Sequence, residues 1–410
     1  MKICAIIAEY NPFHNGHKYQ IEKAKKITGC DSVLVLMSGN FVQRGTPAIF
    51  NKWDRANLAT SNGVDIVIEL PVIYATSSAE YFASGAISLL NKLNSVDYLC
   101  FGTENDDIEL LTKLSDILIK EPKEYKNILN SELKKGISYP KARSNSLKAY
   151  FKNEIPEDLL DEVLLNPNNI LAIEYIKALK KTNSTIVPIA IKRKDAPYNS
   201  TEINGKYASS TAIRELLSKD EISKIHDVCP SSTLKMIANN LSVGLRPMTI
   251  YNYENEIMYK LRTMKEIELN EILDVSDNID RVLNKAISNN STIDDIIENI
   301  KSKRFTLSRI QRILIHSLLD IKTEYVNKYK CNPQYARVLS ISSKNKKIIS
   351  KLNKYTEIPI VTSIANFMKK CNNEQKEMME KDILATNIYM LGNEIPEFRY
   401  YNLDYTKRII

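Results

Sequence analysis

The sequence lacks several features that mark particular protein classes. No run of about 18 apolar residues occurs in the 410-residue chain, so we expect no membrane-spanning helix. The N-terminus enters an apolar run at once, without the charged segment and cleavage site of a signal peptide. Six scattered cysteines form no CxxC pair, which favours reduced thiols in a cytoplasmic protein over disulfides or a metal site. No fixed-period repeat or low-complexity linker occurs, and the length allows two or three domains.

Histidine is also scarce, yet two of the four histidines lie in one loop. The stretch EYNPFHNGH, residues 9–17, follows the apolar run Ile3–Ala8 and precedes residues with helical spacing. The pattern predicts a strand, a tight loop and a helix. His14 and His17 would then lie beside the free backbone N–H groups of a helix start, with Gly16 allowing close approach, which suits a polyphosphate. The alternative is that both histidines only cap the helix.

Apolar strand-like runs alternate with helical segments over the first half of the chain. This alternation predicts an α/β fold, with a parallel, Rossmann-like sheet that is buried on both faces. Such sheets bind ligands beyond the carboxyl ends of their strands, where loop 9–17 would lie. We predict one domain over residues 1–220, with a helical insertion at about 108–165, and a mainly helical domain over 221–410. The predicted strands are Ile3–Ala8, Ser32–Met37, Val64–Leu70, Val96–Phe101 and Ile186–Ile191, and the predicted helices are Lys18–Ile27, Lys52–Asn62, Ser78–Leu93 and Asn168–Lys181.

Other candidate residues lie where these elements begin or end. SSTAIRELL, Ser209–Leu217, places hydroxyl groups and Arg214 at a helix start, where an anion could bind, although a plain N-cap is the alternative. Gly102 and Arg193 follow strands, and Asn168 opens a helix. An ordinary turn glycine and a helix cap are the alternatives for Gly102 and Asn168.

Positive charge is concentrated in one part of the chain. The net charge is +8, but residues 301–350 alone carry 12 Lys or Arg and 2 Asp or Glu. Within this part, Lys301–His316 has an apolar helical stripe, and its arginines are predicted to line the opposite face. A local excess of this kind indicates a surface for a polyanion, and a merely solvated basic face is the alternative.

Four stretches carry a resemblance to a known family. AEYNPFHNGH resembles the HxGH motif of the nucleotidyltransferase superfamily, and SSTAIRELL resembles its ISSTxIR motif. MSGNFVQRGTPAIFNKWDRA (Met37–Ala56) and VIELP (Val67–Pro71) extend the resemblance to the bacterial tRNA(Met) cytidine acetate ligases. The resemblance covers roughly the first 220 residues strongly. The chain departs from the family pattern at Ala172, where glycine is usual, and at Tyr198-Asn199-Ser200, where a YHD-like triplet is usual.

The resemblance implies a two-step ligase. Acetate would attack the α-phosphate of ATP and release pyrophosphate, and the N4 amino group of the wobble cytidine in the anticodon of elongator tRNA(Met) would take the acetyl group. Mg²⁺ would enter only as the counter-ion of ATP, and neither a metal site nor a protein partner is indicated. No residue resembles an acyl-carrying nucleophile. The alternatives are a nucleotidyltransferase that joins AMP or CMP to a small phosphate ester, and a non-catalytic RNA-binding protein.

The resemblance also assigns roles to individual residues. His14 and His17 would stabilise the reacting phosphate. Apart from the resemblance, the polar residues and two glycines of Ser38–Gly45 follow the second strand and suit a substrate loop, with an ordinary surface loop as the alternative. Lys52 and Arg55, which open the next helix, could neutralise acetate or phosphate. The residues expected to contact ATP are Ile7, Ala8, Glu9, Tyr10, Asn11, Pro12, Phe13, His14, Asn15, Gly16, His17, Lys18, Tyr19, Gln20, Gly102, Asn168, Arg193, Ser209, Ser210 and Thr211, and those expected to contact tRNA are Arg304, Arg309 and Arg312.

Overall fold

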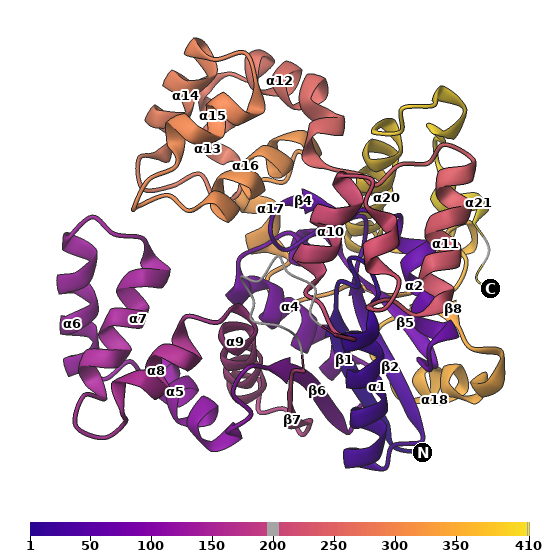
Figure 1. Ribbon diagram of the computed structural model, residues 1–410, viewed down its shortest axis with the longest axis horizontal. Coiled ribbons are helices and arrows are strands. Elements are labelled where there is room, and N and C mark those ends of the chain that lie inside the picture. The colour runs from indigo at the N-terminus through magenta and orange to yellow at the C-terminus, as the bar shows by residue number, and fades with distance from the viewer. Residues whose placement is uncertain (195–204, 408, 410) are drawn as a thin grey trace.

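The computed structural model describes residues 1–194, 205–407 and 409 (Figure 1). Its strands are β1 Ile3–Ala8, β2 Ser32–Ser38, β3 Phe41–Val42, β4 Thr46–Pro47, β5 Ile66–Leu70, β6 Tyr98–Thr103, β7 Val187–Lys192, β8 Ala336–Ile341 and β9 Ile360–Val361. The α-helices up to residue 218 are α1 Asn15–Thr28, α2 Lys52–Ser61, α3 Val72–Ala75, α4 Ala79–Lys92, α5 Ile108–Lys120, α6 Lys123–Lys134, α7 Tyr139–Tyr150, α8 Glu157–Leu164, α9 Pro167–Lys181 and α10 Ser210–Ser218. The later α-helices are α11 Ser231–Ser242, α12 Glu254–Thr263, α13 Glu266–Glu271, α14 Ile279–Asn289, α15 Ile293–Ile300, α16 Leu307–Leu319, α17 Thr323–Lys328, α18 Lys347–Tyr355, α19 Ile364–Met368, α20 Asn373–Leu391 and α21 Leu403–Thr406.

Seven strands form one sheet in the order β7-β6-β1-β2-β5-β8-β9. β1 pairs in parallel with β2 and β6, and the β2–β5 and β6–β7 pairs are also parallel. The predicted strands and helices of this region are all present, with ends that differ by at most three residues. The predicted α/β fold with a largely parallel sheet is therefore confirmed, and the carboxyl ends of β1, β6 and β7 lie side by side.

Helices cover both faces of this sheet. Cys4 and Ile6 of β1 pack with Ile21 of α1 and with residues of α2 in one core. Ile3 and Ala5, the alternate residues, pack on the other side with residues of α4 and α9. Because successive side chains of a strand point to opposite faces, burial on both faces explains why the strands are almost continuously apolar.

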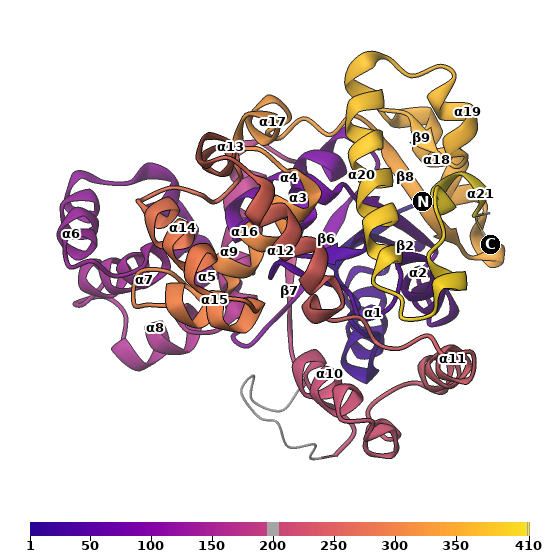
Figure 2. The same cartoon turned by 90° about the horizontal axis from the view of Figure 1, so that it is seen from above.

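Two helical groups extend from the sheet on the same side of the molecule. In Figure 1, α5–α8 lie at the lower left and α12–α15 at the upper left of the central sheet. Figure 2 shows that α18–α21 lie at the opposite end from α6 and α7. Among the described residues, no helix is both long and apolar enough to cross a membrane.

Two strands of the sheet come from the C-terminal half, where the sequence predicts a mainly helical domain. β8 pairs with β5 in antiparallel orientation and with β9 in parallel orientation, and nearly all of β8 is buried. These hydrogen bonds extend the sheet beyond β5, so β8 and β9 belong to the same sheet as β1. The boundary near residue 220 stays a prediction.

Candidate nucleotide-binding site

Loop 9–17 follows the carboxyl end of β1 and leads into helix α1. His14 is the N-cap of α1, and its Nδ1 accepts a hydrogen bond from the Gly16 N–H at 3.0 Å. His17 Nδ1 accepts one from the His14 N–H at 3.3 Å, and the two rings stack with centroids 3.7 Å apart. This reciprocal capping orients both rings. It uses the Nδ1 atom of each ring, and the Nε2 atom of each ring takes no part in the cap.

Both imidazoles are neutral at neutral pH. Burial lowers the pKa of His14 well below its usual 6.5, and the charges of His17, Arg193 and Arg214 act in the same direction. Burial and the charge of Arg193 lower the pKa of His17 to about 3. Because each Nδ1 accepts a hydrogen bond, the single proton of each neutral ring lies on Nε2. Each histidine can therefore donate one N–H to a phosphate oxygen without carrying a charge.

This ionisation state predicts the pH dependence of activity. If the reaction needed an imidazolium, the rate of adenylate formation would fall about tenfold per pH unit above about 6.5. Since folding lowers both pKa values, we expect no such fall in acetate-dependent ATP–pyrophosphate exchange between about pH 6 and pH 8. A fall through pH 6.5 that disappears in His17→Gln would show that His17 acts in its protonated form.

The second motif lies against the first. Ser210 Oγ lies 3.0 Å from His14 Nε2, and Ser209 caps α10 by accepting a hydrogen bond from the Ala212 N–H at 3.1 Å. Within the described part of the chain, the N–H groups of Ser210 and Thr211 donate no hydrogen bond. They remain available to an anion at the positive end of α10.

Two expected phosphate contacts differ in the structure. The sequence predicts free N–H groups at the start of α1, but the Asn15 N–H donates to Val228 O at 2.9 Å and the Gly16 N–H donates to His14. Arg214 donates to the carbonyl oxygen of Asn11 at 2.8 Å, so it ties α10 to loop 9–17. The donors that remain for a ligand are thus the Nε2–H of His17 and the N–H groups at the start of α10, while His14 Nε2 would have to exchange its contact with Ser210 Oγ for one with the ligand.

The ends of β6 and β7 bring further predicted residues to this place. A Cβ atom added to Gly102 would lie 3.4 Å from the Arg193 side chain and 3.9 Å from Gln20 Nε2, so these three residues are neighbours. Asn168 Nδ2 donates to Glu104 Oε1 at 2.6 Å, just beyond β6. The sequence analysis missed Asn169, which is fully buried and accepts hydrogen bonds from the N–H groups after β6. Asn169 could have been found from the sequence by its position next to Asn168 at the start of a predicted helix.

Much of the predicted ATP-contacting loop is a support for the histidines. Tyr10 and Phe13 are 1% and 0% exposed, and the Tyr10 ring packs edge-on against His17 with centroids 4.8 Å apart. Asn11 Oδ1 accepts a hydrogen bond from the Ile49 N–H at 2.8 Å. These side chains therefore hold the loop in shape. The triplet Tyr198-Asn199-Ser200 lies outside the described residues.

Lys52 and Arg55, predicted to neutralise acetate or phosphate, have partners within the protein, and their contact with a substrate stays a prediction. Both side chains are completely buried. Lys52 Nζ lies 2.8 Å from Glu69 and 2.9 Å from Asp404, and Arg55 donates to backbone carbonyls that include Ser38 O at 3.2 Å. The two cations therefore hold the loop after β2 in place.

Two of the three arginines predicted to contact tRNA are also turned inward. Arg312 is 8% exposed, and its Nε donates to the Asp274 carboxylate at 2.6 Å. Arg309 donates to the Asp274 carbonyl at 3.0 Å and lies 3.1 Å from Asp277. These two arginines therefore form no outward basic face, because residues 274–277 cover that side of α16, and their contact with tRNA stays a prediction. Arg304 is exposed.

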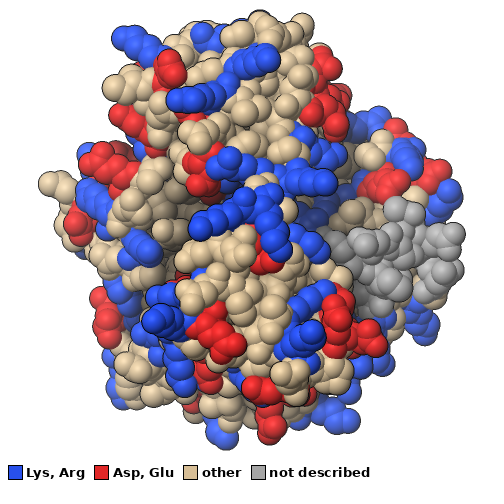
Figure 3. Space-filling view, turned by 90° about the vertical axis from the view of Figure 1, so that its left-hand side faces the viewer, with Lys and Arg blue, Asp and Glu red and all other residues tan. Residues whose placement is uncertain are grey.

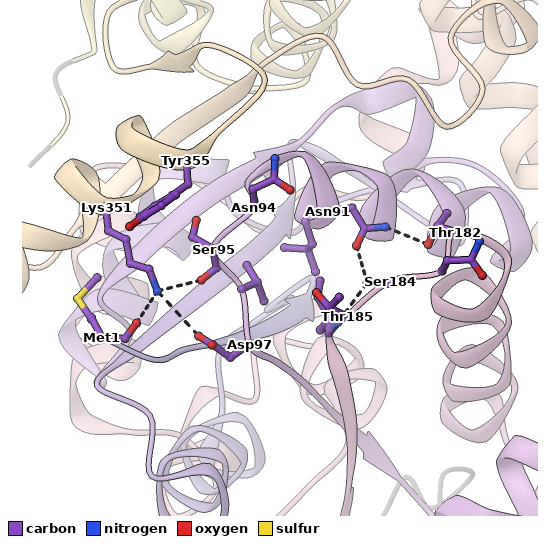
Figure 4. Close-up of a pocket in the computed structure, with 14 residues that line it drawn as sticks. Met1, Asn91, Asn94, Ser95, Asp97, Thr182, Ser184, Thr185, Lys351 and Tyr355 are labelled. Carbon is purple, nitrogen blue, oxygen red and sulfur yellow. Dashed lines mark hydrogen bonds and ion pairs between the residues drawn. The ribbon is translucent and has the colours of Figure 1, made fainter.

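Figure 4 shows a polar pocket at another place. Met1, Ser95 and Asp97 line it near the amino ends of β1 and β6, and Lys351 lies 3.9 Å from the Asp97 carboxylate. His14 follows the carboxyl end of β1, so the pocket lies at the opposite edge of the sheet. It is not part of the candidate nucleotide site.

We expect none of the six cysteines to react with substrate. Cys4 and Cys100 are buried on paired strands with sulfur atoms 3.2 Å apart, and burial raises the pKa of Cys229 to about 12. We expect a variant with all six cysteines changed to Ala or Ser to melt earlier but to keep exchange activity within about twofold, since no thiolate is needed. Changing only Cys331 and Cys371 is the milder control. A loss of exchange at an unchanged melting temperature would contradict this.

This site, at the carboxyl ends of parallel strands with paired histidines at a helix start, is typical of the nucleotidyltransferase superfamily. A model of the HIGH nucleotidyl transferase family matches residues 1–403. The chain is 43% identical to the tRNA(Met) cytidine acetate ligase of Caldanaerobacter subterraneus subsp. tengcongensis and 38% identical to that of Acetivibrio thermocellus, and both matches cover 100% of each chain. The chain therefore belongs to the tRNA(Met) cytidine acetate ligase family.

Solved structures agree with this assignment. Thermotoga maritima TmcAL bound with alpha-thio ATP is 33% identical, covers 100% of this chain and 99% of that chain, and superposes with a TM-score of 0.92. The apo form of the same protein gives a TM-score of 0.94 with the same identity and coverage. The similarity thus includes the C-terminal half, where the motifs alone were weak.

Proposed function

We propose that the protein forms acetyl-adenylate from acetate and ATP and transfers the acetyl group to N4 of the wobble cytidine of elongator tRNA(Met), giving N4-acetylcytidine. The observation that carries the proposal is the contact of the two motifs, where His14 Nε2 lies 3.0 Å from Ser210 Oγ beside the stacked His17 ring. In this family, the relatives are named for this ligase reaction. A neighbouring structure holds an ATP analogue.

The geometry suits transfer at a phosphate. In the first step, negative charge on the α-phosphate is stabilised by the neutral Nε2–H groups of His14 and His17, and Arg193 adds positive charge nearby. The start of α10 with Ser210 and Thr211 would hold the leaving pyrophosphate. No bond to the enzyme is required, because the mixed anhydride is itself activated towards the amine of the cytidine. The protein needs only to align the reactants and exclude water.

ATP is the substrate that supplies the driving force, and Mg²⁺ would accompany it as its counter-ion. Among the described residues, no group of three or more His, Cys, Asp or Glu could hold a metal ion. The other partners in the proposal are acetate and elongator tRNA(Met), and the reaction would take place in the cytoplasm.

One experiment separates the proposal from its alternatives. The protein is incubated with ATP, radiolabelled acetate and total tRNA, and with each component left out in turn. We expect acetate-dependent pyrophosphate release without tRNA and labelled N4-acetylcytidine only with tRNA. Transfer of AMP or CMP to an acceptor would instead indicate a nucleotidyltransferase, and tRNA binding without pyrophosphate release would indicate a non-catalytic protein.

A further inference from the structure

We propose that the turn between α6 and α7, together with residues 301–304, forms one two-part surface that binds the RNA backbone. The proposal deepens the proposed function, since it rests on tRNA being the acceptor. The two segments are far apart in sequence but in direct contact, because the Ser138 N–H donates to Lys303 O at 3.0 Å. Ile137 and Phe305, one from each side of this contact, pack into the same hydrophobic core. The position of one segment relative to the other is therefore fixed.

The charges on the two segments have the same sign and are exposed. Lys134 and Lys141 lie on the α6–α7 side, and Lys303 and Arg304 lie on the other. Within the described ranges, none of these four side chains forms an ion pair with a carboxylate, whereas their neighbour Lys135 pairs with Glu132. Figure 3 shows Lys and Arg gathered in a band across the middle of this side of the molecule. Four unneutralised cations around one backbone contact favour a polyanion.

An exposed aromatic side chain favours RNA over other polyanions. Tyr139, the first residue of α7, is 51% exposed; it directly follows Ser138 and lies two residues before Lys141. Unpaired bases in RNA loops stack on aromatic side chains, and Lys or Arg beside the ring neutralise the adjoining phosphates. An anticodon loop offers both features. The surface thus fits the single-stranded part of the acceptor.

The surface is also connected to the nucleotide site. Residues 301–304 lead into α16, and the backbone of Arg312 in α16 lies so close to Gly45 that an added Cβ would be 2.2 Å from it. Leu307 to Arg312 spans roughly 7.5 Å of helix. From the β3–β4 hairpin, the Gln43 N–H donates to Glu9 Oε1 at 3.0 Å, and Glu9 begins loop 9–17. The two-part surface is therefore linked to loop 9–17 through α16 and the β3–β4 hairpin.

Salt-dependent tRNA binding tests the proposal with matched double variants. Lys134→Ala with Lys141→Ala removes one part of the surface, and Lys303→Ala with Arg304→Ala removes the other. Each pair should lower the magnitude of the slope of log K against log salt by about 1.5, and all four changes together by about 3. Lys369→Ala with Lys370→Ala is the control, because α19 lies at the other end of the molecule (Figure 2). It should change neither the slope nor the affinity.

Further measurements distinguish a loss of tRNA binding from a loss of catalysis or of folding. Acetate-dependent pyrophosphate exchange and melting temperature should stay at wild-type values in every variant, because the changed side chains are exposed. Tyr139→Ala should weaken binding about tenfold while Tyr139→Phe keeps it. If the variant Lys134→Ala with Lys141→Ala binds tRNA with wild-type affinity at every salt concentration, the two-part surface is overturned. A wild-type protein that exchanges pyrophosphate but binds no tRNA would instead overturn the proposed acceptor.

Discussion

Replacing His14 or His17 by alanine is expected to reduce acetate-dependent ATP–pyrophosphate exchange by about 10²–10³-fold. Each variant loses one oriented Nε2–H donor at the place where charge develops on the α-phosphate. The loss should appear in kcat and not only in KM for ATP, because a donor aimed at the reacting phosphate acts mainly in the transition state. Exchange assays over a range of ATP and acetate concentrations measure both quantities.

Structural loss must be separated from chemical loss, since both histidines also cap α1. His14→Asn keeps a good N-cap oxygen, and His17→Gln keeps an N3 side chain that can accept the N-cap N–H. In each variant the amide oxygen takes the place of Nδ1 in the cap, and the fixed Nε2–H donor of the imidazole is lost. We expect both variants to melt near the wild-type temperature and to remain defective in exchange. Wild-type exchange in either variant would remove that histidine from the reaction.

The meeting of His14 with Ser210, 196 positions apart, could be expected from the family resemblance, because both motifs are assigned there to ATP. The position of loop 9–17 needs no resemblance. A strand followed by a Gly-containing loop and a helix places its polar residues at the carboxyl end of a parallel sheet. Gly102 and Arg193 follow strands and therefore reach the same edge. Residue type and local periodicity are enough for such positions, since every link in the inference is between near neighbours in the chain.

Contacts between distant segments could not be predicted in this way. The strand β8 is short and apolar, but nothing in its own sequence indicates that it pairs with β5. The helical spacing of α16 places Arg309 and Arg312 opposite the apolar stripe, and only the fold shows that Asp274 lies against that side. An amphipathic pattern thus predicts which side chains are polar, but not whether water or another segment meets them.

The burial of Lys52 is the same kind of long-range effect. Glu69 of β5, Arg337 of β8 and Asp404 of α21 surround it, with ion-pair distances of 2.8 Å for Lys52–Glu69 and 3.0 Å for Arg337–Glu69. All four side chains are at most 4% exposed. The two cations and two carboxylates give the cluster a net charge of zero when all four side chains are present. It joins the end of the chain to the sheet beneath the loop Ser38–Gly45.

Lys52→Met should therefore destabilise the protein by about 3–5 kcal/mol, because it leaves two buried carboxylates with Arg337 as their one cation. Urea unfolding measures this cost, and Lys26→Met on the exposed side of α1 is the control, with an expected change within about 0.5 kcal/mol. The double variant Lys52→Met with Glu69→Gln should recover part of the loss, since one cation and one anion leave together. If Lys52 instead served acetate, Lys52→Met would raise KM for acetate at an unchanged free energy of unfolding. That outcome would require the cluster to open during catalysis, and Lys52 would then return to the list of substrate-binding residues.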